Sequence, residues 1–439
     1  MQNLIHITQR LFSRTLSSDE NSRALQISGF IRFGLILLQG IILVKAGFDP
    51  VFIAIVESFF FLYNLSRYYF LSGGKYAGFS TLKNKSDAFS TIFWGFNVIG
   101  LIAVVISLMI MNWSGGEFSN ILDLPYVSMA FPTLVFLSLP VDSYDLFYIS
   151  QNKPNRLITY TIVSSIIQLA IVVGLLVGGF HMGQVVLGLT IFFMLRYLHL
   201  ILISKPFSGV AISGSWKFVI YASPLILHSL LAGLTDYVDG WLIKAYFDDA
   251  AFAIYRFGAR ELPLNAILIG SVVSGLILHK NAIGDSLKIE MRKILKLLTP
   301  ILALAILISP WLFQAAYSED YKLSALYFNL YALLMISHAV FAQVYIYRAD
   351  DRWLLTVISL AEVICNIGLS IVLMQSLGIL GIPIATLIVD FVFRCIIMLI
   401  VRVKYDISPS TYYPIKSHLG SSMILMTCFA ISYFMFFNT

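Results

Sequence analysis

The 439-residue sequence is poor in charged side chains. Asp, Glu, Lys and Arg make up 12% of the residues, whereas hydrophobic residues make up 59%. A water-soluble protein of this size needs more polar side chains than that to cover its surface. The shortage of charge excludes a soluble globule and indicates that most of the chain lies in a lipid bilayer.

Cysteine is scarce, and no metal-binding or catalytic motif is present. Cys365, Cys395 and Cys428 lie in apolar runs, without the spacing of a metal site or a disulfide framework. The seven His show no metal-ligand spacing, and there is neither a phosphate-binding glycine loop nor a nucleophile elbow. We therefore expect no enzyme activity, no catalytic residue, no metal site and no cofactor.

Positive charge is in excess, but it is not gathered in one patch. The net charge is +6, and the basic residues lie mainly in short segments between apolar runs, which is typical of membrane orientation and not of nucleic-acid binding. Of the 29 Lys and Arg, only Lys45, Lys244 and Lys322 fall on the predicted outer side. This bias predicts that the N-terminus is cytoplasmic. The basic residues within predicted helices are Arg32, Arg196, Arg256, Arg260 and Arg394.

Long hydrophobic runs dominate the rest of the sequence. A membrane-spanning helix needs about 20 apolar residues, and thirteen such runs occur. No predicted loop is long enough to fold as a soluble domain, and the longest are 72–87 and 280–293. The sequence thus predicts an all-α polytopic membrane protein. The runs are 25–44, 49–71, 88–111, 122–149, 156–177, 183–203, 215–246, 250–279, 294–316, 323–347, 353–374, 379–401 and 417–437.

An internal repeat divides these runs into two sets of six. Residues 43–55 align without gaps on residues 242–254, and both segments contain Lys-Ala-x-Phe-Asp at a predicted outer turn. We expect two parallel six-helix bundles around a central cavity, because transporters are commonly built from such repeats. The predicted divisions are residues 1–208, residues 209–405 and an extra C-terminal helix in 406–439.

Ionisable residues within the predicted helices are the candidate site. Asp236 and Asp239 share one face of the seventh run, and Arg256 and Arg260 share one face of the eighth. Asp239 and Arg260 are equally far from the hairpin turn, which predicts that they face each other near the middle of the bilayer. A charge at that depth is costly, so it usually faces a wet cavity or a partner.

Further charges extend this candidate site. Asp390 and Arg394 are one turn apart on one helix, and Glu362 is placed to approach Arg394. Arg32, and Lys244 at the outer mouth, add positive charge suited to a phosphate. Two interpretations remain open for these groups, namely ion pairs that only fix helix packing and a functional cavity.

Other polar residues have an open interpretation at this stage. Arg196 either joins the cavity or extends to the membrane interface, where we also expect Asp142 and Asp145. His228 belongs either to a proton relay or to a hydrogen-bonded packing contact.

Several segments resemble the polysaccharide-biosynthesis (O-antigen, Wzx-like) flippases. They are Ser215-Trp-Lys-Phe, Ala222-Ser-Pro-Leu, Gly233-Leu-Thr-Asp-Tyr-Val-Asp-Gly-Trp-Leu-Ile, Ala253-Ile-Tyr-Arg-Phe-Gly-Ala, Asn366-Ile-Gly-Leu-Ser and Leu377-Gly-Ile-Leu-Gly-Ile-Pro-Ile-Ala-Thr. The resemblance spans roughly residues 212–403. It implies a superfamily that also contains multidrug exporters and lipid II flippases, alternating access, and an undecaprenyl diphosphate-linked oligosaccharide as cargo. The thirteenth run departs from the even helix number common in that family.

With this resemblance, we expect a flippase for O-antigen or lipopolysaccharide biosynthesis in the bacterial inner membrane. Arg32, Arg256, Arg260 and Lys244 are expected to bind the anionic head. Asp236, Asp239, Glu362, Asp390 and Arg394 are expected to balance charge or to couple transport to protons or sodium. The expected partners are the lipid-linked oligosaccharide and membrane lipids. The alternatives are an ion-coupled multidrug exporter of the same fold, a polysaccharide polymerase or ligase, and a purely structural membrane subunit.

Overall fold

The computed structural model describes residues 20–84, 88–113, 126–207, 209–259, 284–317, 319–340, 342–349 and 351–437. In these ranges the secondary structure is helical throughout, with two short 3₁₀ turns, Glu319–Tyr321 and Gly378–Leu380. The α-helices are α2 (Glu20–Lys45), α3 (Pro50–Asn84), α4 (Phe89–Trp113), α6 (Val127–Val141), α7 (Tyr144–Ser150), α8 (Pro154–Val177), α9 (Met182–Ser204), α10 (Gly209–Tyr246), α11 (Asp249–Gly258), α13 (Gly284–Ala316), α14 (Lys322–His338), α15 (Gln343–Arg348), α16 (Arg352–Leu377), α17 (Gly381–Tyr405), α18 (Pro409–Tyr412) and α19 (Ile415–Phe436).

The helices form a polytopic membrane bundle, as predicted. Ten helical segments among the described residues are long and apolar enough to cross a membrane, and the segment Arg352–Tyr405 contains both α16 and α17. Large apolar side chains such as Leu202, Val403 and Met423 are 72%, 76% and 71% exposed. An apolar surface of this kind is stable against lipid tails and not against water. The protein is therefore an all-α polytopic membrane protein.

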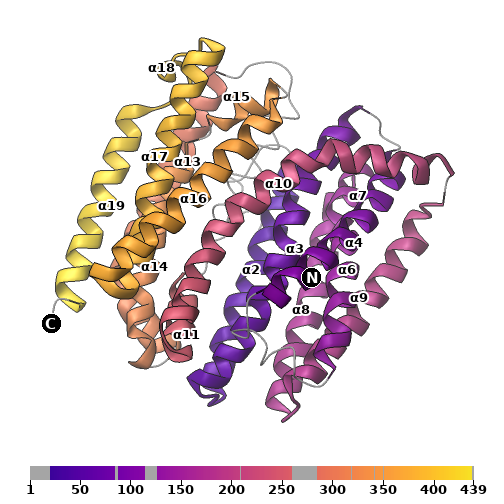
Figure 1. Ribbon diagram of the computed structural model, residues 1–439, viewed down its shortest axis with the longest axis horizontal. Helices are drawn as coiled ribbons and strands as arrows, with labels where there is room; N and C mark the ends of the chain where they lie inside the picture. The colour runs from indigo at the N-terminus through magenta and orange to yellow at the C-terminus, as the bar shows by residue number, and fades with distance from the viewer. Residues whose placement is uncertain are drawn as a thin grey trace.

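Two groups of helices flank α10 (Figure 1). Helices α2 to α9 gather on one side and α13 to α19 on the other, while α10 packs against α3, α4 and α16. The predicted boundaries at residues 208 and 405 stay a prediction, because α10 contacts both groups. We call the end of the bundle that carries Lys153, Lys205, Arg352 and Lys404 the basic end.

Helix α3 is longer than the sequence suggested. The predicted loop 72–87 is wrong over most of its length, because α3 continues to Asn84. Two close packing contacts explain the continuation. A Cβ on Gly73 would lie 2.5 Å from the backbone of Ile226, and a Cβ on Gly74 would lie 2.7 Å from the ring of Phe96. These glycines let α10 and α4 approach α3, so the helix extends along its neighbours.

The two copies of the internal repeat have the same local structure. Asp49 accepts a hydrogen bond from the backbone N–H of Phe52 at 2.6 Å, just before α3 begins. Asp248, its counterpart in the repeat, accepts one from the N–H of Ala251 at 2.6 Å, just before α11 begins. Both aspartates thus satisfy an N–H group that a helix start leaves unpaired. The repeat therefore encodes a capped turn between two helices.

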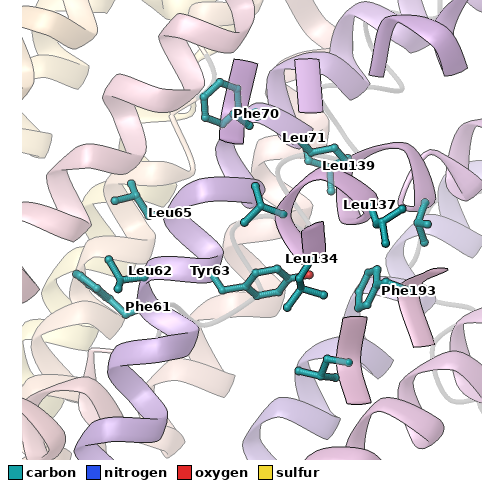
Figure 2. Close-up of a cluster of buried hydrophobic side chains, with 14 of the residues drawn as sticks. Phe61, Leu62, Tyr63, Leu65, Phe70, Leu71, Leu134, Leu137, Leu139 and Phe193 are labelled. Carbon is teal, nitrogen blue, oxygen red and sulfur yellow. The ribbon is translucent and has the colours of Figure 1, made fainter. Parts of the chain in front are cut away.

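Helix α3 is packed on two opposite faces, as Figure 2 shows for Phe61 and Tyr63. Phe61 lies 4.2 Å from Tyr237 of α10 between ring centroids, and 5.8 Å from Phe252 of α11. Tyr63 points the other way, and its ring centroid is 6.5 Å from that of Phe193 in α9. Helix α3 is therefore a wall common to the first group of helices and to α10 and α11.

The thirteenth hydrophobic run forms α19, which packs on α13 and α14. Buried polar contacts fix this packing. Thr299 donates a hydrogen bond to Ser421 at 2.7 Å, and Asn329 donates one to Ser432 at 3.1 Å. In a bilayer such hydrogen bonds hold helices together where hydrophobicity cannot. The predicted extra C-terminal helix is thus part of the bundle.

Candidate functional site

Asp145 is the centre of the first group of buried charges. It lies in the first turn of α7 and is 4% exposed. Both terminal nitrogens of Arg32 in α2 donate to it, at 3.2 and 2.7 Å, and Lys75 of α3 forms a further ion pair with it. The forked guanidinium and the carboxylate match in geometry, so this contact fixes the orientation of Arg32.

Asp142 holds a second pair of cations beside the first. It follows the last residue of α6 and forms ion pairs with Arg67 of α3 and Arg196 of α9. Arg196 also donates to the hydroxyl of Tyr160 at 2.6 Å, and its guanidinium lies 4.8 Å from the ring centroid of Phe193. Arg196 is therefore buried in the bundle and does not extend to the membrane interface.

We call these six residues, Arg32, Arg67, Lys75, Asp142, Asp145 and Arg196, the N-terminal charge cluster. Both of its carboxylates lie at the break between α6 and α7, because Asp142 follows the last residue of α6 and Asp145 lies in the first turn of α7. In the ion pairs given for the described residues, four cations stand against two carboxylates, which leaves a formal excess of two positive charges within this set. The side chain of Arg32 is 33% exposed, so part of this positive charge is accessible. The cluster can attract an anion and bind it with charge-assisted hydrogen bonds.

Asp239 of α10 is the centre of the second site, which we call the Asp239 site. Its side chain is fully buried and accepts hydrogen bonds from Tyr331 Oη at 2.8 Å, Thr386 Oγ1 at 2.6 Å and Asn366 Nδ2 at 3.3 Å. All three donors are neutral and come from α14, α17 and α16. Among the described residues, the structure gives Asp239 hydrogen bonds and no ion pair. A buried carboxylate without a cation is a group that readily takes up a proton.

A third group of charges, which we call the Asp390 cluster, contains Asp390, Arg394, His338, Ser337, Gln343 and Glu362. Arg394 donates to Asp390 at 2.9 Å and to Gln343 at 2.8 Å. His338 Nε2 lies 3.1 Å from Asp390, and Ser337 also donates to this carboxylate. The predicted one-turn pair of Asp390 and Arg394 is confirmed. Glu362 of α16 is counted with this cluster because it lies one helical turn from Asn366, and its approach to Arg394 stays a prediction.

Lys244 and Arg256 lie where α10 and α11 meet α3. Lys244 donates to Ser58 of α3 at 2.9 Å and lies 3.7 Å from Asp249. The guanidinium of Arg256 lies 4.8 Å from the ring centroid of Phe61. Both predicted cations thus join the first group of helices to the α10–α11 hairpin.

Two predicted site residues cannot be placed. Arg260 lies outside the described residues, and nothing is described for the side chain of Asp236. The predicted facing of Asp239 and Arg260 therefore stays a prediction.

Sequence reasoning did not single out several buried charges. Arg67 and Lys75 were counted with the loop cations, and Asp142 and Asp145 were assigned to the interface. Glu57 was not considered, although it is 4% exposed on α3, one turn before Phe61. A usable signal was present for Arg67 and Glu57, because both lie inside a predicted apolar run, where a charge needs a partner.

The sequence matches no family model and no curated protein. Solved structures nevertheless share its fold. The eukaryotic MATE transporter AtDTX14 has a TM-score of 0.62 at 12% identity, covering 94% of this chain and 97% of that one. The lipid II flippase MurJ, in an inward closed conformation, has a TM-score of 0.56 at 17% identity, covering 93% and 92%. A MOP-superfamily transporter from Pyrococcus furiosus has a TM-score of 0.59 at 13% identity, covering 88% and 95%. The chain therefore has the fold of MOP-superfamily membrane transporters.

Proposed function

We propose that this protein is a flippase that carries an undecaprenyl diphosphate-linked oligosaccharide, such as an O-antigen unit, across the inner membrane. The observation that supports this proposal most directly is the N-terminal charge cluster, in which cations outnumber carboxylates four to two. A diphosphate has the charge to match this excess. The fold supports the proposal, since a transporter named as a lipid II flippase shares it.

The cluster provides suitable chemistry for a diphosphate. Arg32 presents a planar fork that can bind two phosphate oxygens at once, and Asp145 holds that fork in place. Lys75 and Arg67 add charge from α3, and their side chains are 18% and 19% exposed, respectively. Arg256, on the other side of α3, provides a further cation for the same head group or for its sugars.

Alternating access is part of the proposal, with the basic end in the cytoplasm. At the opposite end an apolar cluster joins α3 to α11, α13 and α14, and it includes Ile53, Phe257, Tyr317 and Tyr321. The ring of Phe257 lies 4.6 Å from that of Tyr317 and 5.0 Å from that of Tyr321. Such a cluster closes the outer end, so cargo would enter from the basic end.

Coupling to protons is assigned to Asp239. Its three neutral hydrogen-bond donors stabilise the carboxylate without neutralising it, so a proton can bind and leave as the protein changes state. Protons entering from outside would drive the opposite movement of the cargo.

The main alternative is an ion-coupled multidrug exporter, because MATE transporters share the fold. The positive excess of the N-terminal charge cluster opposes a cationic drug, since like charges repel. A polymerase or ligase is disfavoured by the predicted lack of a large outer loop. We therefore do not assign enzyme activity.

Export of lipid-linked oligosaccharide by vesicles tests the proposal. Arg32→Gln removes one charge-assisted contact, worth about 1.5 to 3 kcal/mol, and should weaken cargo binding about 10- to 100-fold. Arg32→Lys should lose less, because it keeps the charge but not the fork. Arg402→Gln is the matched control, since Arg402 is exposed at the end of α17.

A normal rate of export by a well-inserted Arg32→Gln, Arg67→Gln double variant would show that the cluster only fixes helix packing. Transport of a cationic drug, with none of the lipid-linked oligosaccharide, would support the multidrug exporter instead.

A further inference from the structure

The polar groups of the Asp239 site continue toward the basic end on two helices. On α16, Glu362 lies one turn from Asn366, and on α17, Asp390 lies one turn from Thr386. One helical turn of four residues spans about 6 Å. The Asp390 cluster is therefore the next polar layer beyond Asp239.

Helices α14 and α10 contribute to the same column. His338 lies seven residues after Tyr331 on α14, which returns it to the same face two turns nearer the basic end. On α10, His228 lies 2.7 Å from Ser359 Oγ, and Ser359 precedes Glu362 by three residues on α16. Four helices thus line one column of polar side chains.

In the described parts of α10 and α17, buried isoleucines follow Asp239 and Thr386 in the other direction. One turn from Asp239 toward the opposite end, α10 carries Ile243, and one turn from Thr386, α17 carries Ile382. Both isoleucines are fully buried, and α16 adds at that level only the small buried hydroxyl of Ser370. In contrast, the side chains of His338 and Arg394 are 15% and 18% exposed. Exchange of a proton on Asp239 is therefore favoured through the Asp390 cluster.

The charges of the Asp390 cluster suit proton transfer. Asp390 and Arg394 form an ion pair without net charge, and His338 contacts the same carboxylate at 3.1 Å. Glu362 and His338 are therefore the two groups beside this pair that can exchange a proton. Protonated Glu362 beside neutral His338 has the same total charge as ionised Glu362 beside protonated His338. A proton can thus move between them without adding net charge to the membrane interior, which would be costly.

Other titratable groups face this column. At Asp239 these are Tyr331 and, hydrogen-bonded to it, Tyr255 of α11. In the Asp390 cluster they are Glu362, His338, Asp390 and Arg394. His228 contributes from α10, one layer nearer the basic end. Asp390 is held by its ion pair with Arg394 and His228 lies one layer further on, so Glu362 and His338 are the candidates next to Asp239.

We propose that Glu362 carries the coupling proton between Asp239 and the basic end, with His338 as the next acceptor. The O–H bond of the Asp239 carboxylic acid breaks, a water molecule passes the proton on, and an O–H bond forms on Glu362. The Glu362 acid then returns to carboxylate as a ring nitrogen of His338 takes the proton and releases it to water. This inference rests on the proposed proton-coupled transport for its role, but the path itself can be tested without cargo.

Infrared spectroscopy of the full chain in lipid vesicles tests the path alone. The pH is lowered until a carboxylic acid band appears that Asp239→Asn removes, and the exchange of its proton for deuterium is timed in heavy water. Glu362→Gln should slow this exchange about a hundredfold, which is the lower limit of the effect expected when a positioned proton carrier is removed. Glu362→Asp should slow it less. Asp351→Asn, which removes a half-buried carboxylate that pairs with Lys404 at the basic end, should leave it unchanged.

Two spectroscopic results would overturn the path. One is exchange in Glu362→Gln as fast as in the wild type. The other is the absence, at every pH, of a carboxylic acid band that depends on Asp239.

A transport assay distinguishes failure of the proton path from failure of the proposed function. Vesicles containing undecaprenyl diphosphate linked to a fluorescent oligosaccharide are measured with and without a pH gradient. Glu362→Gln should move cargo at the wild-type rate without a gradient and should gain nothing when a pH gradient is applied. Full acceleration of Glu362→Gln by the gradient, or driving by sodium in place of protons, would refute the path. A wild type that moves no cargo but shows the infrared effect would refute only the proposed function.

Discussion

The crossing of α3 and α10 at Gly73 gives a sharp prediction about stability. A Cβ on Gly73 would lie 2.5 Å from three backbone atoms, namely N and Cα of Ile226 and O of Leu225. Carbon atoms in ordinary contact are about 3.5 to 4.0 Å apart, so Gly73→Ala must part the two helices by about 1 Å. Because backbone cannot rotate away as a side chain can, we expect this substitution to loosen the contact along the crossing.

The expected size follows from two opposing effects. Overpacking costs about 1 to 3 kcal/mol, and a backbone clash belongs at the upper end of that range. Replacing glycine by alanine within a helix returns about 1 kcal/mol. Gly73→Ala should therefore destabilise the protein by about 2 kcal/mol. Gly34→Ala in α2 is the matched control, because nothing lies within 4 Å of its added Cβ. It should gain up to about 1 kcal/mol.

Unfolding of the purified variants in detergent measures this difference. Gly73→Ala should unfold at a lower temperature than the wild type, and Gly34→Ala at the same or a higher temperature. Gly74→Ala should lie between them, because its Cβ meets the movable ring of Phe96 at 2.7 Å. If Gly73→Ala proved as stable as Gly34→Ala, α3 and α10 would not cross this closely in the protein.

Three further predictions concern charges. Asp145→Asn should lower the free energy of unfolding by about 3 kcal/mol, which is the low end of the range for a broken buried ion pair. The low end applies because Arg32 is partly exposed, so water can solvate its charge when the partner is lost. Adding Lys75→Met should restore part of the unfolding temperature, and failure to do so would argue against the shared ion pair. Asp49→Ala and Asp248→Ala should each lower stability by about 1 kcal/mol through the lost cap, and unequal losses would show that the two turns differ. In export assays with membrane abundance checked, Arg256→Lys should be partly active and Arg256→Gln severely impaired, whereas equal activity would exclude a role for the guanidinium.

Sequence alone predicted most of the helices, because each one needs a long apolar run that is visible locally. It missed the breaks that divide the run 122–149 into α6 and α7 and the run 323–347 into α14 and α15, and the predicted loop 280–293 is wrong from Gly284, where α13 begins. It failed at the end of α3, where Lys75 appeared to mark a loop. Lys75 is tolerated inside the helix because Asp145, 70 residues later, neutralises it. A pattern read along one segment contains no information about a partner so distant.

The same limit explains which site contacts could be predicted. Asp390 and Arg394 are four residues apart on one helix, so their pairing follows from helix geometry. The partners of Asp239 are 92, 127 and 147 residues away. Tyr331, Asn366 and Thr386 are neutral and common in membrane helices, so nothing in their type identifies them as ligands of one carboxylate. Only the packing of α10 against α14, α16 and α17 reveals them.

Helix α10 has a mechanical consequence for any movement of the bundle. Its 38 residues span about 57 Å, so this one helix is long enough to contact both groups of helices. Pro224 lies within it and cannot donate the backbone hydrogen bond that would stiffen the helix there. Thr356 of α16 donates to the carbonyl oxygen of Pro224 at 3.0 Å, and Ile226 touches Gly73 of α3 two residues later. The contacts of α10 with α16 and with α3 thus meet at Pro224, so a bend of α10 there would move both groups of helices at once.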